Sequence, residues 1–139
     1  MLYSFHILFN ATLLGVILVT QFVSYPMFLS VDRKSFTSYH MNYTFNISKI
    51  VLPLMVIELF FVIEMLINNY NLYSLISFFL IIVVWLSTFF IQVPLHNSLS
   101  KKYCELKIKK LIFSNWIRTF SWFIKLIVLF YLGEIIWKI

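Results

Sequence analysis

Residues 72–93 read LYSLISFFLIIVVWLSTFFIQV, and this stretch decides the fold class. It is longer than the roughly 18 apolar residues that mark a membrane-spanning helix. No Asp, Glu, Lys or Arg occurs anywhere between Glu64 and Lys101. A charged side chain in the middle of a bilayer is costly, so a long interval without charge is typical of a membrane span.

Three further apolar stretches of similar length predict helices at about 7–27, 47–67 and 113–132. The chain is 62% hydrophobic and 12% charged, whereas soluble domains are roughly 45 to 50% apolar. The connections between the stretches are short. The sequence therefore predicts an all-α, polytopic membrane protein, an antiparallel four-transmembrane-helix bundle forming one domain over residues 1–139. An amphipathic helical segment through Phe36 and His40 is expected to lead into the second span.

The net charge of +6 is concentrated in two of the connections. The first carries Arg33 and Lys34, and the third carries five lysines against a lone Glu105. Cytoplasmic loops of membrane proteins are enriched in Lys and Arg. We therefore expect loops 1 and 3 in the cytoplasm and both termini outside, in what we take to be a bacterial inner membrane. The lipid bilayer, rather than nucleic acid, is then the partner that explains the charge.

Polar side chains recur at helical spacing inside the spans, where hydrocarbon should reject them. One face carries Trp85, Thr88, Gln92 and His96, and another carries Asn115, Arg118, Trp122 and Lys125. Residues three or four apart share one face of a helix. With Gln21 and Tyr25 at the end of the first span and His40 before the second, these groups are predicted to converge at one cytoplasmic mouth.

Glu58 is the acidic residue placed deepest in a predicted span. A carboxyl at that position cannot reach the membrane surface, so it must be paired, protonated or functional. We expect it to face the interior of the bundle, with Lys125, a Tyr hydroxyl or water as its partner.

These residues define a candidate site. We assign candidate catalytic roles to His40, His96, Arg118 and Glu58, and candidate ligand-binding roles to Gln21, Tyr25, Trp85, Gln92, Asn97, Asn115, Trp116, Trp122 and Lys125. Imidazole titrates near neutral pH and suits an acid or base. Arg118 and Asn115 suit an oxyanion or carbonyl, and Trp85 and Trp122 suit a flat ring.

The same residues also allow a purely structural interpretation. Arg118 can extend to lipid phosphates, and Gln92 and Asn115 can hydrogen-bond neighbouring helices. His40 and His96 are weak candidates for metal ligands, because no His-x-x-x-His or Glu-x-x-His pair brings two ligands onto one turn. The sequence assigns no cofactor.

Two segments carry a resemblance to a known family. Val93-Pro94-Leu95-His96-Asn97-Ser98-Leu99 and Asn115-Trp116-Ile117-Arg118-Thr119 resemble motifs of a small four-span membrane family that includes anthrone oxygenase-like proteins. The resemblance implies a membrane enzyme that handles a flat aromatic or quinone-like molecule with oxygen, without requiring a metal. Asn97, Trp116 and Arg118 match motif positions, whereas His96 departs from the neutral polar residue usual there.

Three functions stay open at this stage. The first is an oxidoreductase or oxygenase-like enzyme, or a binding protein, for an aromatic, quinone-like or lipid-soluble small molecule. The second is a proton-coupled transporter, assembled as a homo-oligomer, that uses Glu58. The third is a structural accessory subunit of a larger membrane complex, in which the polar residues would only fix how the helices pack.

Overall fold

The computed structural model describes the backbone of residues 2–136 and the side chains of residues 3–131. Every regular element in that part of the chain is helical. In chain order the elements are α1 (Leu2–Val19), η1 (Thr20–Ser24), α2 (Tyr25–Met27), η2 (Phe28–Ser30), α3 (Phe36–Asn68), α4 (Leu72–Ser87), η3 (Thr88–Gln92), α5 (Val93–Leu99) and α6 (Glu105–Ile136).

These elements form four long rods. α3 and α6 are each one continuous rod, and the other elements join end to end into two more, one from α1 to η2 and one from α4 to α5. Each rod is long and apolar enough to cross a membrane: Tyr3–Ser30, Phe36–Asn68, Leu72–Leu99 and Glu105–Tyr131. The prediction of an all-α bundle with four membrane-spanning helices is confirmed, and the chain is an integral membrane protein.

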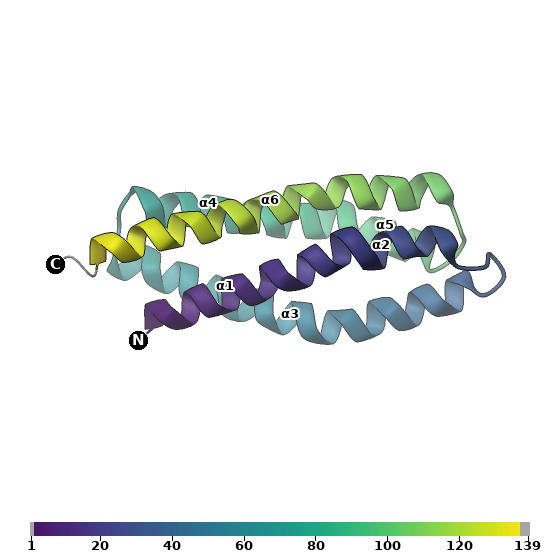
Figure 1. Cartoon of the computed structure of the whole chain (residues 1–139), viewed down its shortest axis with the longest axis horizontal. Coiled ribbons are helices and arrows are strands. Elements are labelled where there is room, and N and C mark those ends of the chain that lie inside the picture. Colours follow the sequence, from purple (N-terminus) through teal and green to yellow (C-terminus); the bar gives the residue numbers. More distant parts are fainter. Residues whose placement is uncertain (1, 137–139) are drawn as a thin grey trace.

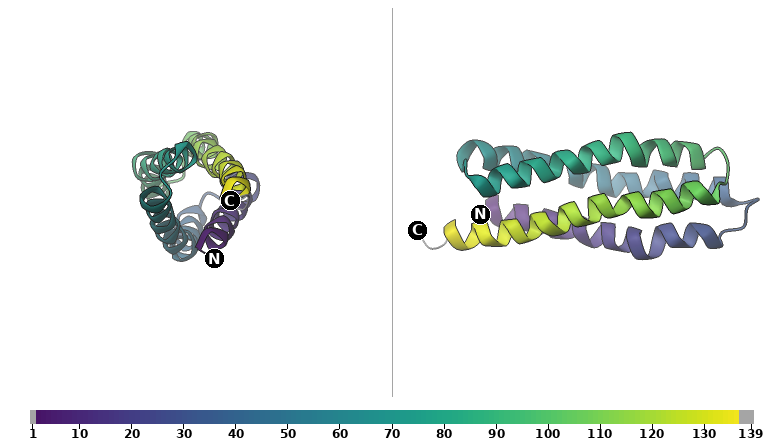
Figure 2. Two further views of the ribbon diagram at one scale, coloured as in Figure 1. Left: turned by 90° about the vertical axis from the view of Figure 1, so that its left-hand side faces the viewer. Right: turned by 90° about the horizontal axis from the view of Figure 1, so that it is seen from above.

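The rods run along the long axis of the molecule, with the two chain ends at one end and the connections 31–35 and 100–104 at the other (Figure 1). We call the latter the loop end. Viewed end-on, the rods surround a central axis (Figure 2). The first rod packs against α3 and α6, and α4 packs against the same two helices.

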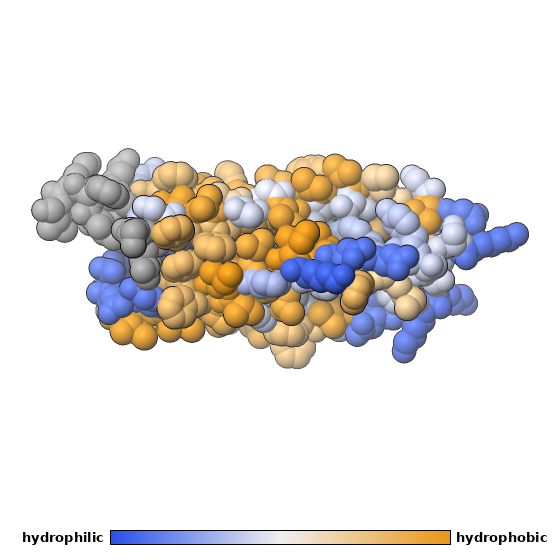
Figure 3. Space-filling model, turned by 90° about the horizontal axis from the view of Figure 1, so that it is seen from below, coloured by the Kyte–Doolittle hydropathy of each residue, from blue (hydrophilic) through white to orange (hydrophobic). Residues whose placement is uncertain are grey.

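The surface and interior have the polarity expected in lipid. Large apolar side chains such as Phe60, Phe79, Phe90 and Phe113 point outward and are more than half exposed. Figure 3 shows apolar side chains over much of one flank and hydrophilic ones gathered at the loop end. Polar residues such as Asn10, Glu58 and Lys125 are buried inside the bundle, where other helices supply their hydrogen-bond partners.

The helices extend further at the loop end than the hydropathy predicted. The expected helical lead-in through Phe36 and His40 is confirmed, and it is continuous with the second span, which begins at Phe36 instead of 47. The third span continues to Leu99 instead of 93, and the fourth begins at Glu105 instead of 113. These extra turns are amphipathic, and they bury Phe36, Leu99 and Ile108 completely. Hydropathy follows the lipid-facing surface, so it misses turns that bury only one face.

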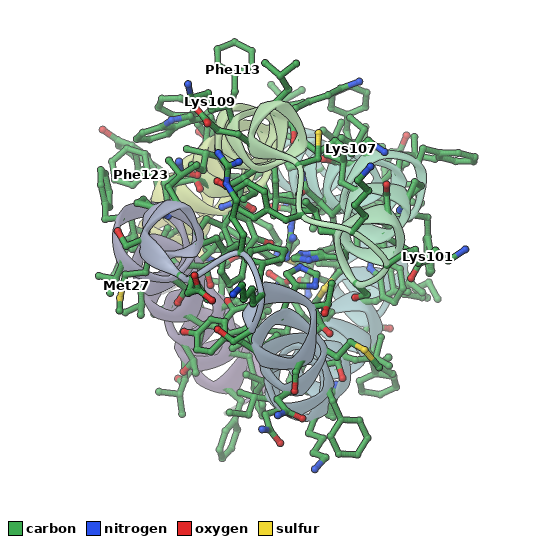
Figure 4. The ribbon with its side chains drawn as sticks, turned by 90° about the vertical axis from the view of Figure 1, so that its right-hand side faces the viewer. Met27, Lys101, Lys107, Lys109, Phe113 and Phe123 are labelled. Atoms are coloured by element: carbon green, nitrogen blue, oxygen red, sulfur yellow. The ribbon has the colours of Figure 1, made fainter. Side chains whose placement is uncertain are left out.

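At about 50 Å, α3 exceeds the roughly 30 Å of hydrocarbon in a bilayer. α3 is therefore longer than the hydrocarbon layer that it would cross, and hydrophilic side chains gather at the loop end. Figure 4 looks onto this end, with Lys101, Lys107 and Lys109 around it and Phe113 and Phe123 pointing away from the bundle.

Two wide π-helical turns interrupt the rods, η1 in the first and η3 in the third. Each is followed within two residues by proline, Pro26 and Pro94, which has no N–H for the helix ladder. Each begins with a threonine that hydrogen-bonds four residues back, Thr20 to Val16 and Thr88 to Val84. Such turns often occur at functional sites.

Candidate functional site

Glu58 lies in a cluster of hydrogen-bonded polar side chains in the middle of the bundle. Its Oε1 accepts a hydrogen bond from Lys125 Nζ at 2.6 Å, and its Oε2 accepts one from Trp122 Nε1 at 2.8 Å. Lys125 Nζ also lies 3.0 Å from His6 Nε2. Glu58 and Lys125 are fully buried. The predicted partnership of Glu58 with Lys125 is confirmed, and both carboxylate oxygens are used within the protein.

A second set of contacts joins the first and third rods to α6. Asn115 Nδ2 donates to Gln21 Oε1 at 2.9 Å, and Gln21 Nε2 donates to the carbonyl oxygen of Ile112 at 3.1 Å. Gln92 Nε2 donates to Ser114 Oγ at 3.1 Å. In hydrocarbon, side-chain hydrogen bonds of this kind hold helices together. Asn115 and Gln21 therefore connect helices, which is the role that the structural interpretation assigned to Asn115.

The two histidines of the loop end are hydrogen-bonded to each other. His40 Nε2 lies 3.0 Å from His96 Nδ1. His40 Nδ1 lies 3.0 Å from Ser100 Oγ, and His96 Nε2 lies 2.9 Å from the Tyr25 hydroxyl. The Arg118 guanidinium lies near the same hydroxyl. The result is one continuous chain of polar groups from the third connection into the bundle.

One arrangement of protons satisfies this whole chain. Tyr25 donates to His96 Nε2. His96 Nδ1–H then donates to His40 Nε2, and His40 Nδ1–H donates to Ser100. The two imidazoles also allow the reverse arrangement, because each neutral ring has one donor and one acceptor nitrogen, and the Tyr25 O–H is then released toward the cavity. A row of hydrogen bonds whose donors and acceptors can exchange roles is able to transfer a proton along it.

A cavity of about 370 Å³ lies among the four rods. Its walls in the middle of the bundle are apolar and include Leu13, Ile17, Val51 and Met55. Its polar walls include Tyr25, Gln92, His96, Asn97 and Arg118. Trp85 and Trp122 also line it, and both π-helical turns contribute, through Thr20 and Thr88. Ligand sites typically combine such apolar walls with a few polar groups, at volumes of about 300 to 1,000 Å³.

The structure brings together only part of the predicted site. Of the candidates, Tyr25, Trp85, Gln92, His96, Asn97, Arg118 and Trp122 line the cavity. His40 reaches it through His96. Glu58, Lys125, Gln21 and Asn115 lie outside its walls, and each makes a hydrogen bond to another helix.

Trp116 is the clearest correction. It shares a motif with Arg118 but faces another side of α6, where its ring lies edge-on to Phe22 and stacks with Phe120. Residues 116 and 118 are two positions apart on a helix, so they cannot share a face.

The polar faces of the third and fourth spans meet, as predicted, but through other contacts than the named pairs. Gln92 bonds Ser114 rather than Asn115, and Tyr25, which is hydrogen-bonded to His96, lies near Arg118. Sequence reasoning did not identify Tyr43, Thr20 or Ser100 as site residues. The repeated spacing of Thr20 before Pro26 and Thr88 before Pro94 was the available signal.

The structure places no third metal ligand beside His40 and His96 in the described part of the chain. Among the residues that the structure describes, no group of three or more His, Cys, Asp or Glu side chains is placed to hold an ion.

No family model matches the chain, and no curated protein or solved structure matches it at a significant level.

Proposed function

We propose that the chain is a membrane-embedded enzyme that binds a lipid-soluble small molecule in the 370 Å³ cavity and exchanges a proton with it. The observation that carries this proposal is that the hydrogen-bonded chain from Ser100 through His40 and His96 to Tyr25 ends in the cavity wall. An apolar chamber with one polar end orients a molecule that is mostly apolar.

The proton transfer balances within the protein's own groups. A proton leaves the bound molecule for the Tyr25 oxygen as the Tyr25 proton moves to His96 Nε2. The Nδ1 proton of His96 then moves to His40 Nε2, which leaves His40 as an imidazolium whose Nδ1–H faces Ser100. Arg118 holds an oxygen atom of the bound molecule throughout. Well-positioned acid and base groups of this kind contribute about 10² to 10⁴-fold to a rate.

An overall oxidation is the form of this proposal that the resemblance in 93–99 and 115–119 favours. Proton removal would then be the protein's contribution, and molecular oxygen would accept the electrons. Trp85 and Trp122, on walls of the same cavity, suit a flat aromatic body.

The two competing functions receive less support. A transporter that uses Glu58 needs a carboxyl free to change partners. Both oxygens of Glu58 are instead hydrogen-bonded within the bundle, one to Lys125 and the other to Trp122. An accessory subunit would present its polar residues to another chain, whereas His96, Gln92 and Arg118 are turned inward.

A pair of valine substitutions on α3 tests the binding site. Val51 lines the cavity, and Val56 is exposed on the outer surface of the same helix. Val51→Trp should fill the cavity and remove the lipid-soluble molecule that organic extraction and mass spectrometry recover from the purified protein. Val56→Trp should retain it. An extract of the unmodified protein that contains no such molecule beyond bulk lipid would overturn the proposal.

Proton exchange is tested on the recovered molecule. In D₂O, the unmodified protein should introduce deuterium into it, and His96→Gln should slow that exchange by about 10²-fold or more. Exchange that is equally fast with His96→Gln would mean that His96 does not transfer the proton and would overturn the proton-exchange part of the proposal.

A further inference from the structure

Arg118 is a buried cation at the wall of the cavity. Only 6% of its surface is exposed, and its Nε has no hydrogen-bond partner among the described residues. Its neighbours are uncharged: the Tyr25 hydroxyl lies nearby, and the Trp122 ring centroid lies 5.4 Å from Cζ. The ring attracts the cation weakly compared with a carboxylate.

The acidic residues between 3 and 131 are committed elsewhere. Glu58 pairs with Lys125, and Glu105 pairs with Lys109 on the outside of α6. Glu64 accepts from Asn68 at the opposite end of the bundle, and Asp32 is exposed in the first connection. Within this part of the chain, Arg118 therefore has no carboxylate partner.

Burial of an unpaired charge is expensive, and most ionisable groups avoid it by becoming neutral. Arginine does not lose its proton in proteins, so Arg118 stays charged. Its compensating charge must then come from whatever occupies the cavity.

Two other polar atoms at the cavity also need a hydrogen-bond partner. In the part of the chain that the structure describes, Trp85 Nε1 is a buried donor without a hydrogen-bond partner, and Trp85 lines the same cavity. Within the same residues, Gln92 Oε1 is a buried acceptor without a partner, and Gln92 also lines the cavity. Unsatisfied buried polar atoms are rare in folded proteins, and several around one cavity indicate a missing polar partner.

The remaining walls show where that partner comes from. Leu52 of α3, Phe89 of η3 and Val93 of α5 line the cavity and are also exposed on the lipid-facing surface, at 52%, 52% and 40%. The cavity thus meets the bilayer between α3 and the π-helical turn of the third rod. An occupant can enter sideways from the membrane with its apolar part leading along apolar walls.

We infer that the occupant is a lipid-borne carboxylate, an apolar chain or ring system with one carboxylate group that pairs with Arg118. This inference rests on the proposed function and narrows its substrate class. The planar guanidinium matches a carboxylate through two parallel hydrogen bonds. An intact phospholipid also carries an anionic oxygen, but its two acyl chains and glycerol exceed a chamber of 370 Å³.

Bromine-labelled probes test this inference, because bromine quenches nearby tryptophan and two tryptophans line the cavity. The protein, in phosphatidylcholine nanodiscs, is titrated with ω-bromoundecanoate and with ω-bromoundecanol, which differ only in the charged end. Quenching by the carboxylate should occur at a concentration at least about tenfold lower than quenching by the alcohol.

Arginine variants supply the matched control. Arg118→Gln should abolish the preference for the carboxylate, and Arg118→Lys should retain part of it because the charge remains. Arg33→Gln should leave it unchanged, since Arg33 is exposed in the first connection, with its guanidinium over the Tyr103 ring.

The outcomes separate the two proposals. Equal quenching by both probes, lost in Val51→Trp, would overturn the carboxylate inference and leave the binding site standing. Quenching by neither probe, with no effect of Val51→Trp, would overturn both. A preference that survives Arg118→Gln would also overturn the inference, because the charge would then be recognised elsewhere.

Discussion

His40 Nε2 lies 3.0 Å from His96 Nδ1, so an imidazole pair joins α3 to α5 at the loop end of the bundle. The rings are nearly stacked, with centroids 5.1 Å apart and planes at 29°. The remaining nitrogen of each ring has its own partner, Ser100 for His40 and Tyr25 for His96. The pair therefore connects the third connection with the cavity wall.

Replacing His40 should destabilise the loop end. His40→Ala leaves His96 Nδ1 and the Ser100 hydroxyl without their partner, and it leaves a gap beside Phe28 and Phe36, whose rings contact His40. We expect a loss of about 2 to 4 kcal/mol, measured as thermal stability in detergent. Asn46→Ala, on the exposed surface of α3, is the control. A loss no greater than that of the control would mean that the imidazole pair does not hold α3 to α5.

The Glu58–Lys125 pair should behave as one unit. Lys125→Met leaves a buried carboxylate whose other contact is Trp122, and we expect a cost of about 3 to 5 kcal/mol unless the carboxyl takes up a proton. Glu58→Gln combined with Lys125→Met should cost clearly less than the sum of the two single changes. Thermal unfolding of all four proteins measures this coupling. Additive losses would contradict the geometry.

Tryptophan substitutions should separate the cavity wall from the lipid-facing side of α6. Trp85→Leu should reduce the retention of the bound molecule severalfold, because it removes a ring and an N–H from the wall. Trp116→Leu should leave retention unchanged, because Trp116 packs on Phe22 and Phe120. Mass spectrometry of extracts from both variants measures the difference. The opposite ranking would restore Trp116 to the site.

The orientation predicted from charge can be tested with single cysteines in a Cys104→Ser background. Lys101→Cys, at the loop end, should react with a membrane-impermeant maleimide only after the cells are opened. Asn69→Cys, in the connection at the other end, should react in intact cells. Labelling in the reverse order would place the loop end outside.

The span count and the inward direction of Glu58 follow from the sequence, because lipid imposes one strong rule on where charge can lie. The structure selects Lys125 from the three partners that the sequence allowed for Glu58. The inward direction of Gln92, His96 and Arg118 follows from the same rule. The helical periodicity around Arg118 is equally plain, and it places Trp116 on a different face of the helix from Arg118.

Other features depend on information that periodicity does not contain. The turns up to Leu99 and from Glu105 bury only one face, so hydropathy alone underestimates them, whereas the helical lead-in through Phe36 was predicted. The π-helical turns alter which residues face inward near Tyr25 and Gln92, and simple three-and-four spacing does not anticipate such a change. The hydrogen bond between His40 and His96 joins residues 56 positions apart, and only packing of the helices determines it.

The most direct test of the account is an experimental density map of the protein purified in a lipid nanodisc with no ligand added. The account predicts density for a molecule in the cavity among the four rods, touching Arg118 at its polar end and lying between Trp85 and Val51 along its apolar part. A map in which α3 closes onto the third rod, so that side chains fill this space and Arg118 points to the lipid headgroups, would contradict it.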